Sequence, residues 1–299
     1  MKDSIFYLYG MVLASTSFLL KNGFLKPDEY SEIKEKYRFP GGETGTCATV
    51  LASLGSIVKL DGTHIGINVA PVIKDFYKDK SVNLDSLYFD KNYIGLEDYI
   101  IIADDIRSPM GTFADFFSSG EKRWNEPKED DVINCAVAAI DPYFQEQSQR
   151  AAELCVKHGK PYVTIDCNYD SYIHQNSAIS VISGEGIQNN YPEKTREELF
   201  PLFQEGSNGL TIITNGGKDL FYARKGEKIK TFTPCKVNVV STLGAGDTFK
   251  AGCVYALSKG MSDDDIIKFA SACSAVAITK FPIPLNPPTL DEVLNLLSL

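Results

Sequence analysis

Four kinds of feature are scarce or missing in this sequence, and each absence argues against a class of protein or site. Only three histidines occur among 299 residues, and their positions form no metal-ligand pattern. The seven cysteines are odd in number and include no Cys-x-x-Cys pair, which argues against a disulfide framework or a zinc site. Most of them lie inside apolar runs, so we expect reduced core thiols in a cytoplasmic protein.

Basic clusters and long apolar stretches are missing as well. The net charge is −9, from 30 basic and 39 acidic residues, so we expect no nucleic-acid partner. No stretch is long and apolar enough to span a membrane, and no membrane partner is expected. The apolar segment from Phe6 to Leu20 is interrupted by Gly10 and by Ser15-Thr16-Ser17, which favours a strand entering an insert over a signal peptide.

The most informative segment that is present runs from Lys236 to Gly260. It opens with Val237 to Val240, which has the β-branched composition of a buried strand. The small residues Gly244-Ala245-Gly246 and the carboxylate Asp247 follow, and the apolar residues beyond them recur at the spacing of one helix face. The pattern therefore predicts a strand, a tight turn and a helix.

Such a turn directs backbone N–H groups and the positive end of a helix toward an anion. A bare carboxylate at Asp247 is unfavourable in a site that only binds phosphate. It suits a reaction in which a hydroxyl must lose a proton while amides stabilise a phosphoryl group in transfer. The alternative is an ordinary tight turn in which Asp247 only caps the helix.

These residues resemble a known family. The run Gly244-Ala245-Gly246-Asp247-Thr248-Phe249, followed by Ala251-Gly252, is similar to the C-terminal signature of the ribokinase-like (PfkB) carbohydrate kinases. Gly41-Gly42 partly resembles the other signature of that family, and the separation of the two motifs also fits. The resemblance covers essentially the whole chain.

The pattern of elements and the resemblance predict the same fold. Strands alternate with helices, which favours an α/β protein with a doubly wound, mainly parallel sheet flanked by helices. The resemblance adds a small β-strand lid over the acceptor site, at residues 11–38 and 84–125. Residues 1–10, 39–83 and 126–299 are then the α/β nucleotide- and phosphate-binding domain. The elements expected from the pattern are strands at 4–9, from 57, at 99–103, 132–140, 162–166, 178–182 and 210–214, and helices at 47–54, 68–80, 145–158, 197–204, 262–278 and from 289.

The resemblance implies an ATP- and Mg²⁺-dependent kinase that phosphorylates a hydroxyl of a sugar or sugar-like acceptor. Asp247 is the implied general base, and the amides of Gly244, Ala245 and Gly246 are the implied anion hole for the γ-phosphoryl group. For the metal, Glu185 is the implied ligand through water, although the surrounding motif is irregular in this sequence.

Other segments are implied to bind the two substrates. A strand-end loop and a small-residue helix correspond to the family's nucleotide site, but a common glycine turn and close helix packing are alternative readings. The nucleotide-binding residues expected are Thr214, Gly216, Gly217, Ser271, Asp166 and Asn168. The acceptor-binding residues expected are Gly41, Gly42, Thr46, Ser15 and Arg107, although an exposed arginine without this role is an alternative for the last.

The sequence departs from the family mainly at the acceptor end. Ser15 stands nearest to an aspartate that binds sugar hydroxyls in many members, and Thr46 replaces a usual asparagine. Ser241 and the run Phe281-Pro282-Ile283-Pro284 differ where some relatives bind a monovalent cation. Catalysis therefore looks retained and the substrate changed. A nucleoside kinase of the same fold and a non-catalytic sugar- or nucleotide-binding sensor remain alternatives, and a homodimer formed through the lid is expected.

Overall fold

Strand β1 (Ile5–Gly10) lies inside the main sheet, and its residues from Phe6 to Gly10 are buried. It pairs in parallel with β4 (Ile57–Gly62) on one side and with β8 (Val137–Ile140) on the other. A run of apolar β-forming residues suits a strand that is covered on both faces. The structure is a computed structural model, and it describes residues 5–24, 27–103 and 106–298.

The main sheet has nine strands in the order β13-β12-β11-β10-β9-β8-β1-β4-β5. All pairings from β11 to β5 are parallel, whereas β12 and β13 are antiparallel. The predicted doubly wound, mainly parallel sheet is therefore confirmed. The remaining strands of this sheet are β5 (Val82–Asn83), β9 (Tyr162–Ile165), β10 (Ile179–Ile182), β11 (Leu210–Ile213), β12 (Leu220–Arg224) and β13 (Lys230–Phe232).

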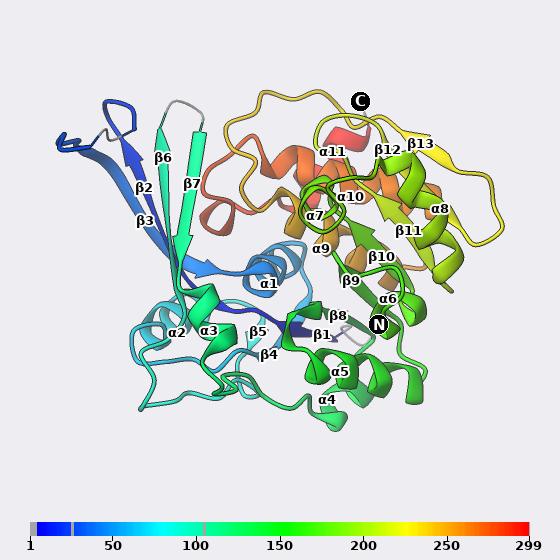
Figure 1. The fold of residues 1–299 in the computed structure, drawn as a ribbon, viewed down its shortest axis with the longest axis horizontal. Helices are drawn as coiled ribbons and strands as arrows, with labels where there is room; N and C mark the ends of the chain where they lie inside the picture. Colours follow the sequence, from blue (N-terminus) through cyan, green and yellow to red (C-terminus); the bar gives the residue numbers. More distant parts are fainter. Residues whose placement is uncertain (1–4, 25–26, 104–105, 299) are drawn as a thin grey trace.

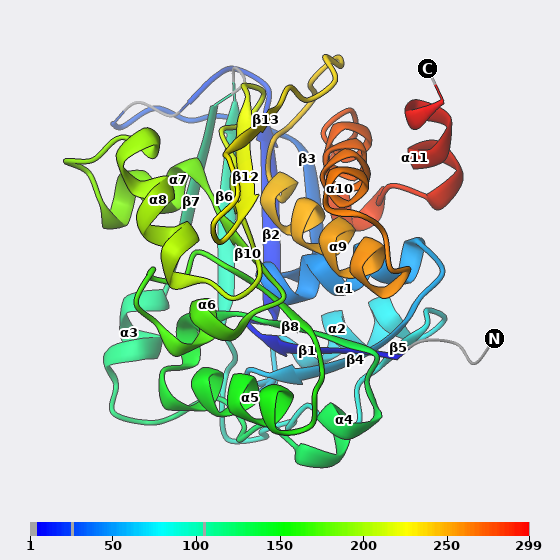
Figure 2. The ribbon, with the colours of Figure 1, turned by 90° about the vertical axis from the view of Figure 1, so that its right-hand side faces the viewer.

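Helices cover both faces of the main sheet (Figures 1 and 2). Because side chains alternate along a strand, Leu8 joins the core on one face while Tyr7 and Tyr9 join the core on the other. The helices that pack on the Leu8 face are α1 (Glu43–Ser53), α2 (Ala70–Tyr77), α9 (Ala245–Ser258), α10 (Asp263–Ala277), the 3₁₀ turn η2 (Ile283–Leu285) and α11 (Leu290–Leu297). The other elements are α3 (Phe113–Ser118), α4 (Glu129–Asn134), the 3₁₀ turn η1 (Pro142–Phe144), α5 (Glu146–Lys157), α6 (Tyr172–Asn176), α7 (Gly184–Asn190) and α8 (Arg196–Gly206).

Within the described ranges, no helix combines the length and apolarity needed to cross a membrane.

A second sheet, here called the lid sheet, stands beside the main body (Figure 1). Its strands are β2 (Leu13–Leu20), β3 (Ile33–Gly41), β6 (Glu97–Ala103) and β7 (Ile106–Gly111), in the order β3-β2-β6-β7. β2 is parallel to β6, whereas β2–β3 and β6–β7 are antiparallel. Strand β3 ends at Gly41, so the lid sheet leads directly into the first residues of α1.

Several predicted elements are wrong. Residues Val237 to Val240 form no strand, and Val239 and Val240 are 57% and 59% exposed. The main sheet ends at β13, so no neighbouring strand pairs with this β-branched run. The strand predicted at 132–140 is divided between α4 and β8, because three acidic residues in the first turn of α4 favour a helix start there. In addition, α1 begins at Glu43, earlier than the predicted 47, and α3 is a helix in a region predicted as strands.

Helices α9 and α10 pack closely against each other at Gly252. A Cβ atom added there would lie 2.7 Å from Ala270 Cα. We therefore expect Gly252→Ala to destabilise the protein by about 1–3 kcal/mol through overpacking, outweighing the gain of about 1 kcal/mol from the better helix propensity of alanine. Urea unfolding measures the difference. Gly217→Ala is the control, since an added Cβ there meets nothing within 4 Å, and an unchanged midpoint for Gly252→Ala would contradict the expectation.

Candidate active site

Asp247 lies in the first turn of α9, which begins after the left-handed glycine Gly244. Gly244 is the N-cap residue with a φ of 81°, a conformation that glycine adopts without strain. A Cβ atom added at Gly244 would lie 3.3 Å from Thr46 Cγ2 of α1 and 3.9 Å from Asp247 Oδ2. First-turn amides have no partner within their own helix, although that of Ala245 donates to the Thr242 carbonyl oxygen at 3.2 Å. The start of α9 therefore presents a carboxylate beside helix-end amides.

The start of α1 forms the facing wall. A Cβ atom on Gly41 would lie 1.8 Å from Ser15 Oγ, and one on Gly42 would lie 2.4 Å from the Met11 carbonyl oxygen. Gly42 has a φ of 76°, so both glycines are needed where the lid sheet meets the main sheet. The structure thus brings Gly41, Gly42 and Ser15 together, and Thr46 extends this wall to the start of α9.

A buried ion pair lies beneath these two helix starts. Lys250, one turn after Asp247, donates to Asp141 Oδ1, and the two side chains are 0% and 1% exposed. Asp141 follows β8, and its Oδ2 accepts from Thr44 Oγ1 at 2.5 Å and from the Met11 amide at 3.3 Å. The charges of Asp141 and Asp247 raise the pKa of Lys250 above its ordinary value, although burial alone would lower it. A single carboxylate therefore ties α9 to α1 and to the chain between β1 and β2.

The carboxylates of the site raise one another's pKa values. Burial, together with the charges of Asp141 and Asp166, raises the pKa of Asp247 to about 7, against the opposing charges of Lys250 and Arg107. Burial and the charges of Asp141 and Asp247 raise the pKa of Glu43, the first residue of α1, to about 8. The charge of Asp247 thus acts on Glu43, and both carboxyl groups have raised pKa values. Such a pKa suits a group that accepts a proton during a reaction at physiological pH.

Asp166 lies just past the end of β9 and is held by the start of α7. Its Oδ1 accepts from the Ser183 amide at 2.7 Å, and its Oδ2 accepts from Ser183 Oγ at 2.9 Å. Burial raises the pKa of Asp166, and the nearby charge of Glu185 raises it further. Asn168 is exposed and accepts from the Tyr191 hydroxyl at 3.2 Å. Asp166 is thus close enough to act electrostatically on Asp247, whereas Asn168 accepts from Tyr191 through its side chain and from Ser171 through its carbonyl oxygen.

The remaining predicted nucleotide-binding residues lie on two further elements. Thr214, Gly216 and Gly217 follow β11, and a Cβ atom on either glycine would meet nothing within 4 Å, so this loop is open. Ser271 on α10 is 5% exposed, and its hydroxyl has no hydrogen-bond partner among the described residues. The neighbouring Ser274 hydroxyl donates to the Ala245 carbonyl oxygen at 2.7 Å, which places this part of α10 beside the start of α9.

Arg107 and Glu185 are the exposed charged residues predicted for the site. Arg107 extends from β7 of the lid sheet, and its charge lowers the pKa of Asp247. Glu185 lies in the first turn of α7 beside Asp166. In the described part of the chain, no group of three or more His, Cys, Asp or Glu side chains is arranged to hold a metal ion. Mg²⁺ in phosphoryl-transfer sites is bound through one or two carboxylates, water and substrate phosphates, and Asp166 and Glu185 fit that smaller donor set.

Four charged residues were not singled out from the sequence although they are buried or partly buried: Glu43, Asp98, Asp141 and Lys250. Glu43 directly follows the glycine pair, and Asp141 follows a strand end as Asp166 does. Lys250 is the clearest missed signal, because a lysine among the small and apolar residues of a buried helix requires a buried partner.

Comparisons with known proteins agree with this geometry. Residues 178–283 match the pfkB family carbohydrate kinase model. The chain is 35% identical to a ribokinase of Haemophilus influenzae over 108 residues, which is 36% of this chain and 34% of that protein. It is 22% identical to a 5-dehydro-2-deoxygluconokinase of Clostridium beijerinckii over 91% of this chain and 87% of that protein.

A solved structure extends the likeness to the whole fold. The ribokinase of Arabidopsis thaliana, solved with ribose and ATP, superposes with a TM-score of 0.82 at 19% identity and covers 100% of both chains. By contrast, the alignments with bacterial ribokinases span about a third of those proteins' length. The matched C-terminal segment contains α9 and its carboxylate, and the fold extends the likeness to the lid sheet. Residues 178–283 therefore resemble the pfkB carbohydrate kinase family, and the chain as a whole has the ribokinase-like fold.

Proposed function

We propose that this protein transfers the γ-phosphoryl group of ATP to a hydroxyl of a sugar or sugar-like acceptor. The observation that carries the proposal is the Asp247 carboxylate at the start of α9, whose pKa of about 7 fits a general base. The relatives named ribokinase and 5-dehydro-2-deoxygluconokinase support the same reaction class.

In this proposal the acceptor lies between the starts of α1 and α9. Gly41 and Gly42 let the start of α1 pack closely against Ser15 and Met11, and Thr46 lies between them and Gly244. Asp247 removes the proton of the acceptor hydroxyl as the oxygen attacks the γ-phosphorus atom, and the bond from that phosphorus to the bridging oxygen breaks, so that ADP leaves. The first-turn amides and the positive end of α9 stabilise the negative charge of the phosphoryl group. Gly244 and Gly246 are the favoured donors, because the Ala245 amide already donates to Thr242.

The nucleotide is placed on the other side of the α9 start. The open loop of Thr214, Gly216 and Gly217 receives it, and the unpartnered Ser271 hydroxyl offers a hydrogen bond. Asp166 and Glu185 would hold Mg²⁺ through water. When bound, Mg²⁺ neutralises part of the phosphate charge.

An ADP-release assay tests the proposed activity. We expect turnover with at least one member of a panel of pentoses, hexoses, polyols and sugar acids, and slower or no turnover with nucleosides. Preferred use of a nucleoside would instead make the protein a nucleoside kinase. Calorimetric binding of a sugar without ADP release in the presence of Mg²⁺ would contradict the kinase proposal and favour a sensor.

Asp247→Asn is expected to reduce kcat by about 10²–10⁴-fold, because the amide cannot accept the proton. The fold is expected to survive.

The pKa of Asp247 is raised above its unfolded value of about 3.9, so ionising this group lowers the stability of the folded state as the pH rises from about 4 to 7. The melting temperature of the variant at pH 8 should therefore equal or exceed that of the wild type. Asp265→Asn, an exposed first-turn carboxylate of α10, is the matched control, and more than a few per cent residual activity in Asp247→Asn would exclude the proposed role.

The pH dependence of kcat/KM should report the ionisation of Asp247. Activity requires the carboxylate, so we expect it to fall as the pH drops through about 7 and to level off above. Because the positive charge of Arg107 lowers this pKa, Arg107→Gln should move the acidic limb to higher pH. Arg107→Lys keeps the charge and should leave the limb nearly in place. A limb at the same pH in all three proteins would show that the titrating group is not Asp247.

A further inference from the structure

Asp98 of the lid sheet carries a carboxylate oxygen without a partner. The side chain is partly buried, and among the described residues no donor lies within hydrogen-bond distance of its Oδ1. Burial raises the pKa of Asp98 to about 6, and a hydrogen bond with Ser15 acts in the opposite direction. The group is therefore mostly ionised at neutral pH. An ionised oxygen shielded from water and left unpaired lowers stability, so a donor from outside the chain would be bound favourably.

The pairing of the lid strands shows which way Asp98 faces. β2 and β6 align Ser15 with Asp98, so both side chains lie on the same face of the lid sheet. The partners of Ser15 and Ser17 on β3 are Phe39 and Tyr37, which share that face.

This face is turned toward the phosphoryl-transfer end. The Tyr37 ring packs edge-on against Phe281, with ring centroids 5.7 Å apart. Phe281 precedes η2, where Ile283 Cδ1 lies 3.5 Å from the position of a Cβ atom on Gly244. Ser15 itself lies against Gly41, at the start of the α1 wall.

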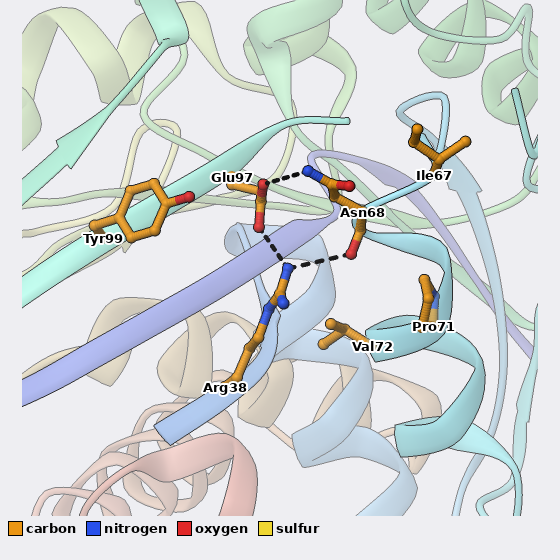
Figure 3. A pocket seen from close by; sticks show the side chains of 7 residues that line it. All are labelled: Arg38, Ile67, Asn68, Pro71, Val72, Glu97 and Tyr99. Carbon is orange, nitrogen blue, oxygen red and sulfur yellow. Dashed lines mark hydrogen bonds and ion pairs between the residues drawn. The ribbon is translucent and has the colours of Figure 1, made fainter. Parts of the chain in front are cut away.

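The neighbouring Glu97 faces the opposite way. Its Oε1 accepts from Arg38 Nη2 at 2.5 Å, and its Oε2 accepts from Asn68 Nδ2 at 3.4 Å (Figure 3). These three residues line a cavity of about 470 Å³ between the rear of the lid sheet and the start of α2. The two consecutive carboxylates therefore differ. Both oxygens of Glu97, on the rear face of the lid sheet, have hydrogen-bond partners, whereas Oδ1 of Asp98, on the other face, has none.

We propose that Asp98 binds hydroxyl groups of the acceptor and selects an uncharged polyhydroxy compound. This inference rests on the proposed function, because it takes the space between the lid sheet and α9 as the acceptor site. A carboxylate accepts strong hydrogen bonds from hydroxyl groups and repels an acceptor that carries a carboxylate or phosphate. Ser15 lies directly beside Asp98 in the paired strands, and the unpartnered Oδ1 of Asp98 is left for the ligand.

The test compares wild type, Asp98→Asn and Glu97→Gln with D-ribose, D-fructose, D-sorbitol and the anionic D-gluconate as probes. For the neutral probe with the highest kcat/KM, we expect the acceptor KM of Asp98→Asn to rise about 10- to 100-fold, the range for losing a hydrogen bond to a charged group. The KM for ATP should stay within about twofold of wild type, because the nucleotide binds elsewhere. Glu97→Gln should change neither KM appreciably, and selectivity for neutral probes over D-gluconate should fall only in Asp98→Asn.

Thermal unfolding separates this role from a structural one. Asp98→Asn removes an unpaired buried charge, so its melting temperature should be unchanged or higher, as is common where a site residue lowers stability. A lower melting temperature with kcat and both KM values impaired together would assign Asp98 to the fold and overturn the inference. An unchanged acceptor KM would overturn it as well.

The outcomes also separate this inference from the kinase proposal. If the wild type binds a neutral probe in calorimetry but releases no ADP, the kinase proposal fails, and the role of Asp98 then depends on whether Asp98→Asn weakens that binding. Turnover that is insensitive to Asp98→Asn leaves the kinase proposal intact and overturns only the role of Asp98. A wild type that neither binds nor phosphorylates any neutral probe overturns the role of Asp98.

Discussion

The ion pair between Lys250 and Asp141 is the constraint on which the arrangement of the site depends. Both side chains are buried, and Asp141 also accepts from Thr44 on α1 and from the Met11 amide between β1 and β2. Breaking such a pair by removing one partner costs about 3–5 kcal/mol, because the other charge is left buried and unpaired. Since Asp247 precedes Lys250 by one helical turn, the contact that fixes Lys250 also fixes the depth and orientation of the proposed base. The space beside Asp141 is so restricted that a Cβ atom on Gly10 would lie 2.2 Å from its Oδ2.

The same pair sets the electrostatic balance of the site. Glu43, Asp141, Asp166 and Asp247 act on one another, and among the described residues the buried cation beside them is Lys250. Because Lys250 is already paired with Asp141, it offsets only part of the negative charge around Asp247. As a result, the pKa of Asp247 lies near 7, whereas an ordinary aspartate ionises at a much lower pH. This surplus of negative charge also gives a physical reason for a metal ion to accompany any phosphate ligand, because phosphate bound without a cation would meet several carboxylates.

The sequence predicted the elements whose signals are local. Strands β1, β9, β10 and β11 are short apolar runs between turns, and α10 and α11 begin at Ser262 and Thr289 with the expected caps. Predictions failed where the outcome depends on distant partners. Val239 and Val240 have strand-forming side chains, but no strand is available beyond β13 to pair with them. The Lys250–Asp141 pair joins residues 109 positions apart in the chain, so neither residue carries a local sign of the other, and only the fold brings them together.

Ser15 and Asp98 show why a comparison of single sequence positions can give a wrong picture of which side chains lie at a site. Ser15 stands where the family resemblance implies an aspartate, which reads as the loss of an acceptor-binding carboxylate. In the folded protein, the pairing of β2 with β6 sets Asp98 directly beside Ser15, on the face of the lid sheet turned toward α9. Directly paired residues on one face of a sheet have Cβ atoms only about 5 Å apart. A functional side chain can therefore lie on either of two paired strands and still reach nearly the same point in space. A carboxylate on β6 therefore lies beside Ser15 of β2, and this neighbour is visible only once the two strands are paired.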